Sequence, residues 1–296
     1  MSTLAAKPVV AGVDGSTDSR MAVDWAARAA QRRHVGLRLV HGFVQPIPYA
    51  TFGYPAHEYE VEVPMKAARA LLAETADRLD LAYPGLPVQR AVIGGGPAGV
   101  LVQESHRASL VVVGARGEGG FGGLLTGSVA TQVAAHAHCP VVVVHREGQP
   151  AGPVVVGVDG SPESDAALGF AFEEAAARGV PLVAVYAWRA LPAGNLGPVT
   201  VWHYDPDEAA REAARLLAEQ LAGWPAKYPD VRVEQRPVLS FNPTETLVDE
   251  SRTAGLVVVG CRGRGGFAGL LLGSVSRGLV HHAHGTVAVI HPYRSS

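Results

Sequence analysis

The chain is predicted to be an α/β protein made of two tandem, doubly wound domains, each with a five-stranded parallel sheet and helices on both faces. Three observations predict this fold class: a long internal repeat, short apolar β-branched segments at matching places in both halves, and alanine-rich segments between them. The composition agrees, because 48% of the 296 residues are hydrophobic and 18% are charged, as in globular proteins.

The repeat appears most clearly in two blocks. Residues 9–16, VVAGVDGS, return as VVVGVDGS at 154–161, and residues 110–128 return at 256–274 with 15 of 19 positions identical. A period of about 146 residues is too long for a solenoid and indicates a duplicated domain, with one net insertion between the two blocks. A polar, Gly/Pro-rich stretch is typical of a linker. The predicted divisions are domain 1 over 1–148, a linker over 149–152 and domain 2 over 153–296.

Each half alternates strand-like and helix-like segments. The expected strands are residues 8–13, 37–41, 88–93, 110–113 and 141–144 in the first domain, and 154–158, 182–186, 231–238, 256–259 and 287–290 in the second. The first, fourth and fifth strands of each set are nearly uninterrupted apolar runs, which is typical of parallel strands buried on both faces.

The helical segments carry start signals and an apolar face. Ser16 and Ser161 are predicted N-caps, and Pro162 takes the favoured first position of its helix. In the first helix, apolar side chains four residues apart form one face that can pack on the sheet. These side chains are Met21, Trp25 and Ala29.

Charge, cysteine content and hydropathy exclude several protein classes. The 25 Lys and Arg residues against 27 Asp and Glu give a net charge of −2, so nucleic acid is not expected as a partner. Two cysteines cannot form a disulfide framework or a four-cysteine zinc site. No apolar run approaches the roughly 18 residues of a membrane span, and residues 1–15 lack the pattern of a signal peptide. A cytoplasmic protein is therefore expected.

Two repeated elements follow strands at the edge where ligands bind in such a sheet. Asp14 and its counterpart Asp159 come directly after the first strand. After the fourth strand, the pattern G-x-x-G, nine residues, G-S occurs at 114–128 and again at 260–274. Glycine lets backbone N–H groups converge on an anion, and the Gly-Ser pair opens a helix whose N-terminus can hold a phosphate. The recurrence of this spacing favours a phosphate cradle over a simple turn.

Three other nucleotide-binding or catalytic motifs do not match this sequence well. A P-loop needs Gly-Lys-Ser/Thr, and none of the chain's lysines follows a glycine. Residues 117–122 match G-x-G-x-x-G, but they follow their strand after a gap, and the second copy has Ala268 in the third glycine place. A G-x-S-x-G nucleophile elbow is absent, and no Ser/His/Asp set can be assembled at strand ends.

The glycine pattern, the aspartate after the first strand and the tandem layout resemble the ATP-binding type of the universal stress protein family, in the two-domain form common in actinobacteria. The resemblance covers almost the whole chain and implies an adenine-nucleotide α-hydrolase-like fold. It implies ATP as the cofactor, two per chain, which Mg²⁺ can accompany. It also implies pairing of the domains through their last strands, a homodimer, an unknown regulatory protein partner, and a role in stress, hypoxia or dormancy.

The resemblance also assigns contacts by matching position, and it assigns no catalytic or metal-binding residue. Around the adenosine end, the implied residues are Gly12, Asp14, Gly42 and Val113, and Gly157, Asp159, Ala187 and Val259. Around the ribose and phosphates, they are Gly114, Arg116, Gly117, Gly119, Gly120, Gly127, Ser128 and Val129, and Gly260, Arg262, Gly263, Arg264, Gly265, Gly266, Gly273, Ser274, Val275 and Ser276. For the two aspartates, the structural alternative is capping of the following helix.

The two sites differ in charge, because Glu118 of the first matches Arg264 of the second, while each keeps an arginine at the position of Arg116. The family usually has a basic residue here, so Glu118 is the departure. A guanidinium instead of a carboxylate beside a triphosphate should favour the second site by about 1 kcal/mol after screening. Tighter ATP binding at the C-terminal site is predicted, unless both side chains face solvent.

Some conspicuous residues are left open. His136 and His138 recur as His282 and His284, but an H-x-H pair near a helix end does not share one helical face, so turn histidines are expected rather than metal ligands. The long aromatic loops 44–59 and 191–205 could cover the nucleotide or bind a partner.

The leading functional hypothesis is an ATP-binding regulatory protein with little or no hydrolysis, not an enzyme, because no recognisable catalytic base, lysine or metal-ligand cluster adjoins the cradle. An adenylylating or slow ATP-hydrolysing enzyme on the same fold is the alternative, although the S-G-G-x-D-S and H-I-G-H motifs are absent. A flavin-binding electron carrier is a third class.

Overall fold

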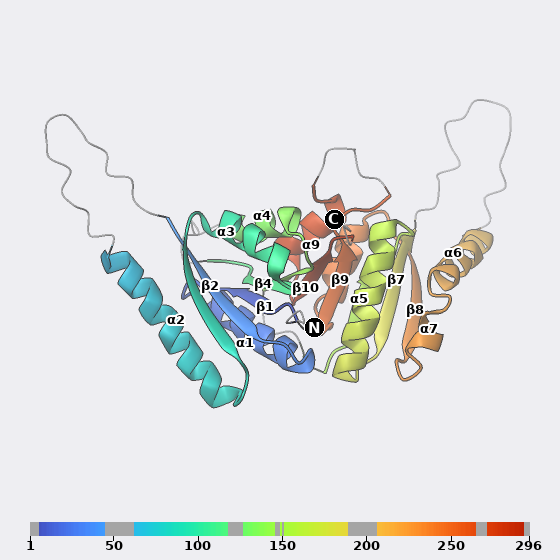
Figure 1. Ribbon diagram of the computed structural model, residues 1–296. Coiled ribbons are helices and arrows are strands. Elements are labelled where there is room, and N and C mark those ends of the chain that lie inside the picture. The colour runs from blue at the N-terminus through green and yellow to red at the C-terminus, as the bar shows by residue number, and fades with distance from the viewer. Residues whose placement is uncertain are drawn as a thin grey trace, which may run out of the picture. The chain divides into compact units, whose positions relative to one another are not determined.

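The computed structural model describes residues 6–44, 62–117, 127–145, 149, 151–188, 206–264 and 271–292. The chain divides into two compact units, within residues 1–146 and 147–292, called unit 1 and unit 2 below (Figure 1). The long loops singled out in the sequence lie almost entirely outside the described residues.

Unit 1 contains a five-stranded parallel sheet. Its strands are β1 (Val9–Gly12), β2 (Leu37–Phe43), β3 (Val88–Gly94), β4 (Leu110–Gly114) and β5 (Val141–Val144). Its helices are α1 (Thr17–Arg32), α2 (Glu62–Ala82), α3 (Pro97–Glu104) and α4 (Ser128–His136), with a 3₁₀ turn at Ser105–Arg107. The order β3-β2-β1-β4-β5 reverses direction between β1 and β4, so the carboxyl ends of these two strands frame a topological switch point.

Unit 2 repeats this arrangement. Its strands are β6 (Val154–Gly157), β7 (Leu182–Trp188), β8 (Val233–Leu239), β9 (Leu256–Gly260) and β10 (Val287–Ile290), in the order β10-β9-β6-β7-β8. Its helices are α5 (Pro162–Arg178), α6 (Pro206–Gln220), α7 (Trp224–Lys227), α8 (Pro243–Glu250) and α9 (Ser274–His282). The predicted doubly wound α/β fold is therefore confirmed in both units.

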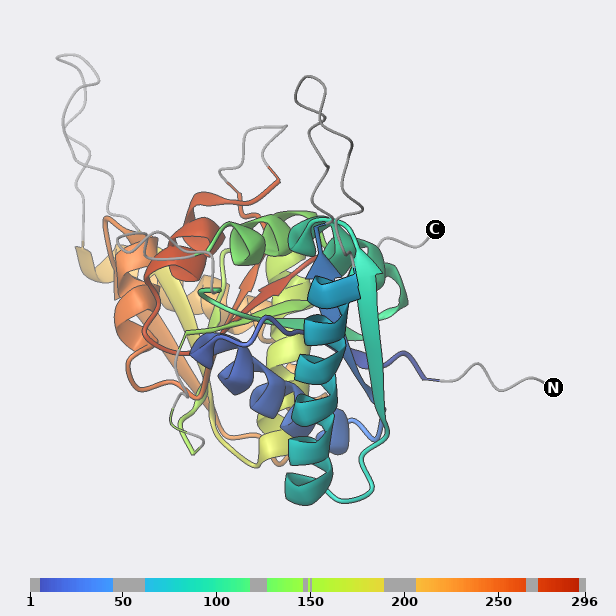
Figure 2. The same cartoon turned by 90° about the vertical axis from the view of Figure 1, so that its left-hand side faces the viewer.

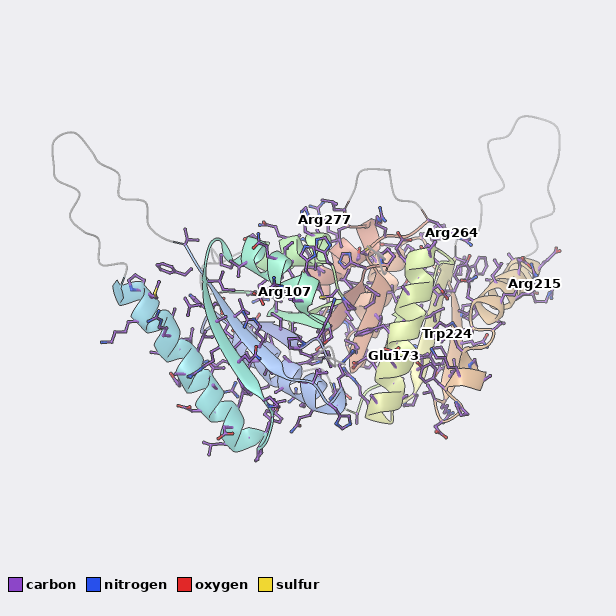
Figure 3. The ribbon with its side chains drawn as sticks, viewed as in Figure 1. Arg107, Glu173, Arg215, Trp224, Arg264 and Arg277 are labelled. Carbon is purple, nitrogen blue, oxygen red and sulfur yellow. The ribbon has the colours of Figure 1, made fainter. Side chains whose placement is uncertain are left out.

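Helices cover both faces of each sheet, as right-handed crossovers require (Figure 2). In unit 1, α1 packs on β1, β4 and β5, while α3 packs on β2 and beside α4. In unit 2, α5 packs on β6 and β9, while α8 packs beside α9. On α5, Phe172 stacks with Trp224 at 5.4 Å between ring centroids, which holds α7 against it (Figure 3 labels Trp224).

The strand cores and helix starts follow the sequence signals. The side chains of β4 and β5 are apolar and buried throughout, apart from the partly exposed Gly114 that ends β4. The Oγ atoms of Ser16 and Ser161 accept N–H bonds from Ser19 and Ser164 at 3.1 and 3.2 Å, which confirms both predicted N-caps. Pro162 is the first residue of α5, also as predicted.

Two strands begin later than expected: β1, predicted over 8–13, spans Val9–Gly12, and β8 starts two residues late. The segment predicted over 231–238 starts at Val233, because the N–H of Val231 closes a turn on the carbonyl of Tyr228 at 3.2 Å. The second, third and fourth strands of both units extend one or two residues past their expected carboxyl ends. Those extra residues bring the chain to the edge where the site residues lie.

Candidate nucleotide site

The aspartate that follows the first strand organises the edge of each sheet. Asp159 Oδ1 accepts the backbone N–H of Ser161 at 3.0 Å and its hydroxyl at 2.6 Å, and Asp14 makes the same bonds to Ser16 at 3.0 and 2.7 Å. Both serines are helix N-caps, so these bonds support the structural role considered for the aspartates, namely helping to cap the following helix. The second oxygen of Asp159 accepts the backbone N–H of Arg264 at 3.0 Å, so this carboxylate also ties the glycine-rich segment to β6.

The glycine-rich segment is closed at its base in both units. The N–H of Gly127 donates to the carbonyl of Ala115 at 2.7 Å, and the N–H of Gly273 donates to Cys261 O at 2.8 Å. In unit 2, the hydroxyl of Ser276 also donates to Cys261 O at 2.8 Å. Gly127 and Gly273 are the N-cap residues of α4 and α9, so the first turn of each helix begins where the segment closes, as expected from the sequence.

Several glycines of the predicted site lie so close to neighbouring atoms that a larger residue would not fit. A Cβ at Gly263 would collide with Asp159 Oδ2, and one at Gly117 would collide with Asp14 Oδ2. A Cβ at Gly260 would lie 2.8 Å from Glu163 Cβ, so this glycine lets α5 approach the end of β9. Gly263 and Gly117 therefore leave room for the aspartate carboxylates. Gly260 and its counterpart Gly114 also allow a helix to pack closely.

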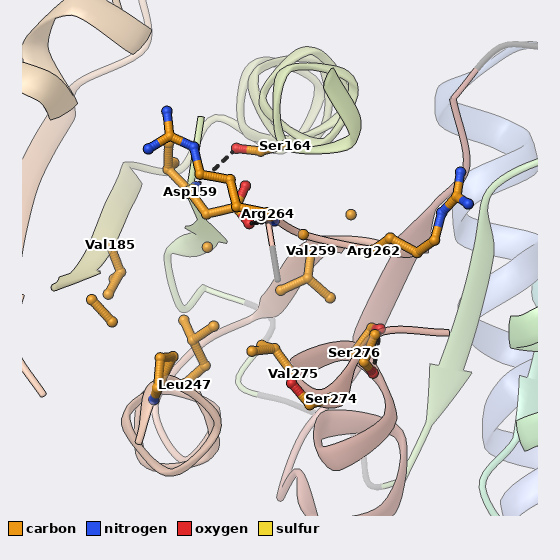
Figure 4. Close-up of a pocket in the computed structure, with 17 residues that line it drawn as sticks. Asp159, Ser164, Val185, Leu247, Val259, Arg262, Arg264, Ser274, Val275 and Ser276 are labelled. Carbon is orange, nitrogen blue, oxygen red and sulfur yellow. Dashed lines mark hydrogen bonds between the residues drawn. The ribbon is translucent and has the colours of Figure 1, made fainter. Parts of the chain in front are cut away.

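A cavity of about 420 Å³ opens at this edge of unit 2 (Figure 4). Its lining comes from the ends of β6, β7 and β9, from the segment that follows β9, and from helices α5, α8 and α9. In this view Val185, Leu247, Asp159 and Arg264 lie on one side of it, and Ser276 and Arg262 lie on the other. A volume of this size falls within the range of small-molecule sites.

The structure brings most of the predicted residues of the second site together. Those that line the cavity are Gly157, Asp159, Ala187, Val259, Gly260, Arg262, Gly263, Arg264, Gly273, Ser274, Val275 and Ser276. Gly265 and Gly266 lie outside the described residues, as do Gly119, Gly120 and Glu118 of the first site. The charge contrast between Glu118 and Arg264 therefore remains a prediction.

The first site's predicted residues occupy matching places in unit 1. Gly12 ends β1, Gly42 lies near the end of β2, and Val113 and Gly114 end β4. The N–H of Arg116 donates to Asp18 Oδ2 at 3.1 Å, and the Ser16 hydroxyl donates to the carbonyl of Arg116 at 3.2 Å. Ser128 and Val129 open α4, next to the N-cap Gly127.

Sequence reasoning missed several lining residues, namely Val158, Ser164, Val185, Pro243 and Leu247. Leu247 matters most, because a Cβ at Gly157 would lie 2.8 Å from its Cδ1. Leu101 makes the same approach to Gly12 in unit 1, at 3.0 Å. The signal was available, since both leucines lie five residues into a proline-started segment after the third strand.

Two arginines place positive charge at the rim of the cavity. Arg262 Nη2 pairs with Glu163 Oε1 at 3.0 Å, which neutralises part of its charge. The guanidinium of Arg264 lies over Gly160, where a Cβ would come 2.5 Å from Nη2, and the φ of Gly160 is +74°. Beneath them, burial raises the pKa of the Cys261 thiol above its usual range, so the thiol stays neutral.

Other predicted features lie away from this edge. The backbone N–H of His138 donates to Ser105 Oγ at 2.9 Å, and its ring stacks on that of His106 at 3.7 Å between centroids. Within the described ranges, no group of three His, Cys, Asp or Glu side chains is arranged to hold a metal ion. In the same part of the chain, no helix is both long and apolar enough to cross a bilayer.

Comparison with known proteins identifies the family. The model of the universal stress protein family matches residues 5–145 and again 151–291. A universal stress protein of Mycolicibacterium smegmatis is 38% identical over 96% of this chain and 97% of its own, and one of Mycobacterium tuberculosis is 41% identical over 95% and 94%. The crystal structure of a universal stress protein from Archaeoglobus fulgidus shares the fold, with a TM-score of 0.68 at 18% identity over 97% of both chains. The chain therefore belongs to the universal stress protein family and carries the family's domain twice.

Proposed function

We propose that each unit binds one ATP at the carboxyl edge of its sheet and that the chain is a nucleotide-responsive regulatory protein with little or no hydrolysis. The observation that carries the proposal is that one cavity of unit 2 is lined both by apolar side chains and by arginines and the start of a helix (Figure 4). Val185 and Leu247 offer surface for a purine base. The start of α9 at Ser274, beside Arg262, offers backbone N–H groups and positive charge for phosphates.

Binding is tested by calorimetry on the full chain with ATP, with and without Mg²⁺. We expect two ATP per chain, with the unit 2 site tighter by about fivefold, the equivalent of the 1 kcal/mol expected from Arg264. Arg264→Glu gives unit 2 the side chain of Glu118 and should bring the two affinities together. Arg107→Glu, on the 3₁₀ turn of unit 1, is the charge-matched control. A wild-type unit 1 site that binds as tightly as unit 2 would remove the charge argument.

A regulatory role predicts that bound ATP persists. The residues around Asp159 Oδ1 and Oδ2 are hydrogen-bond donors, so this carboxylate is engaged rather than placed to activate water. We therefore expect no multiple-turnover release of phosphate or pyrophosphate from ATP. Steady turnover that disappears in the Asp14→Ala, Asp159→Ala double variant would instead establish the enzymatic alternative.

The assembly and cellular role are proposed on the family resemblance alone. We infer a cytoplasmic homodimer that responds to stress, hypoxia or dormancy through a protein partner. Sedimentation of the full chain with and without ATP tests the dimer, because a monomer at all concentrations would contradict it.

A further inference from the structure

The one net insertion between the two copies lies in the loop that leads into Pro243, and Pro243 lines the cavity of unit 2. Strands β3 and β8 match at an offset of 145 residues, whereas the prolines that start α3 and α8 match at 146. The extra residue therefore lies between β8 and α8. Unit 1 has Gly95 and Gly96 at this place, and unit 2 has Ser240, Phe241 and Asn242.

The helix that follows each loop packs differently against the end of the second strand in the two units. In unit 1, a Cβ at Gly42 would come 2.6 Å from Pro97 Cα, so α3 begins directly against β2. In unit 2, the matching residue Ala187 has a Cβ and lines the cavity together with Pro243, the first residue of α8. In unit 2, which has the longer loop, the cavity extends between Ala187 and Pro243, where we place the base of the proposed nucleotide.

Hydrogen bonds hold the inserted loop on both sides of Phe241. The N–H of Ser240 donates to the carbonyl of Trp188 at 2.9 Å, and the Ser240 hydroxyl oxygen accepts from Asn242 N at 3.1 Å and from Thr246 Oγ1 at 2.8 Å. Phe241 itself is 76% exposed and Leu239 is 53% exposed. A fixed loop that presents an aromatic ring to solvent leaves apolar surface that a ligand can cover.

We propose that Phe241 is a base-stacking residue, special to unit 2, that packs on the purine ring of a nucleotide whose base enters between Ala187 and Pro243. The inference rests on the proposed function, because it requires a nucleotide in this cavity. Purine and phenyl rings attract each other through stacking, and stacking tolerates different bases because each offers a π-face. Unit 1, with Gly95 and Gly96 in the loop, has no ring to offer at this place.

The test compares Phe241→Ala with its parent by calorimetry, in a Gly117→Ala background that leaves unit 2 as the reporting site. We expect ATP to bind about tenfold more weakly to the Phe241→Ala variant than to its parent. Inorganic triphosphate has no base and should bind the variant and the parent with equal affinity. Leu81→Ala, which removes an 86%-exposed apolar side chain on α2, is the matched control and should change neither affinity.

A second variant, Phe241→Trp, reports on the surroundings of position 241 through its fluorescence. In Phe241→Trp, ATP should quench the added indole emission and retain its affinity, whereas triphosphate should leave the emission unchanged. Unchanged ATP affinity in Phe241→Ala, an equal loss for ATP and triphosphate, or absence of quenching would overturn the stacking role while leaving ATP binding intact. A parent protein that binds no ATP in unit 2 would overturn the proposed function and this inference with it.

Discussion

Gly263→Ala is expected to weaken ATP binding in unit 2 by about a hundredfold or more. The added Cβ would collide with Asp159 Oδ2, the oxygen that accepts the N–H of Arg264. That carboxylate cannot turn away freely, because its other oxygen is held by two bonds from Ser161. Either the glycine-rich segment moves out of the cavity or these bonds break. Two hydrogen bonds to a charged group amount to about 3 kcal/mol or more, which corresponds to the expected loss.

The structure offers a matched variant for this substitution. Gly117→Ala makes the same collision with Asp14 in unit 1, so it should remove binding there and spare unit 2. Gly99→Ala, on α3, has no atom within 4 Å of the added Cβ and should leave both sites unchanged. Calorimetry with ATP measures all three, and circular dichroism checks their folding. Wild-type ATP affinity in a folded Gly263→Ala protein would show that the Asp159 contact does not shape the site.

Glu174→Gln should lower the free energy of unfolding of unit 2 by about 3 kcal/mol. Glu174 Oε2 accepts bonds from Arg178 Nε at 2.8 Å and Nη2 at 2.6 Å, and the two side chains are 3% and 10% exposed. The glutamine keeps the volume but leaves a guanidinium charge in a buried place. Removal of one partner of a buried ion pair costs far more than the pair's net contribution to stability.

Urea unfolding followed by circular dichroism measures this effect. Glu212→Gln is the exposed control, because Glu212 pairs with Arg215 three residues later in α6, both side chains are more than half exposed, and Arg215 keeps Glu219 at 2.6 Å. Solvent screens such a pair, so this variant should unfold close to the wild type. Equal effects of the two substitutions would mean that burial does not distinguish the two ion pairs.

The alternation of elements could be predicted because its signals are local. Runs such as the four valines of β5 read as buried parallel strands, and Ser161 followed by Pro162 marks a helix start. The start of β8 was predicted too early, because the apolar Val231 belongs to a turn. Apolar character alone does not say whether a residue pairs in a sheet or closes a turn before it.

The site could be predicted only in part, for a physical reason. Asp159 and the glycines recur in both copies at the ends of known strands, so topology places them together. Leu247 and Pro243 reach the cavity through the approach of α8 to β7, which depends on tertiary packing and on the loop that carries Phe241. No periodicity in the sequence reports that approach, although the position of the one-residue insertion marks where the copies differ.

Native mass spectrometry of the full chain, titrated with ATP, tests the central claim most directly. Two successive additions of one intact ATP are predicted for the wild type, and a single addition for Gly263→Ala and for Gly117→Ala. A chain that takes up no ATP at saturating nucleotide, or that takes up the same number in both glycine variants as in the wild type, would contradict the account.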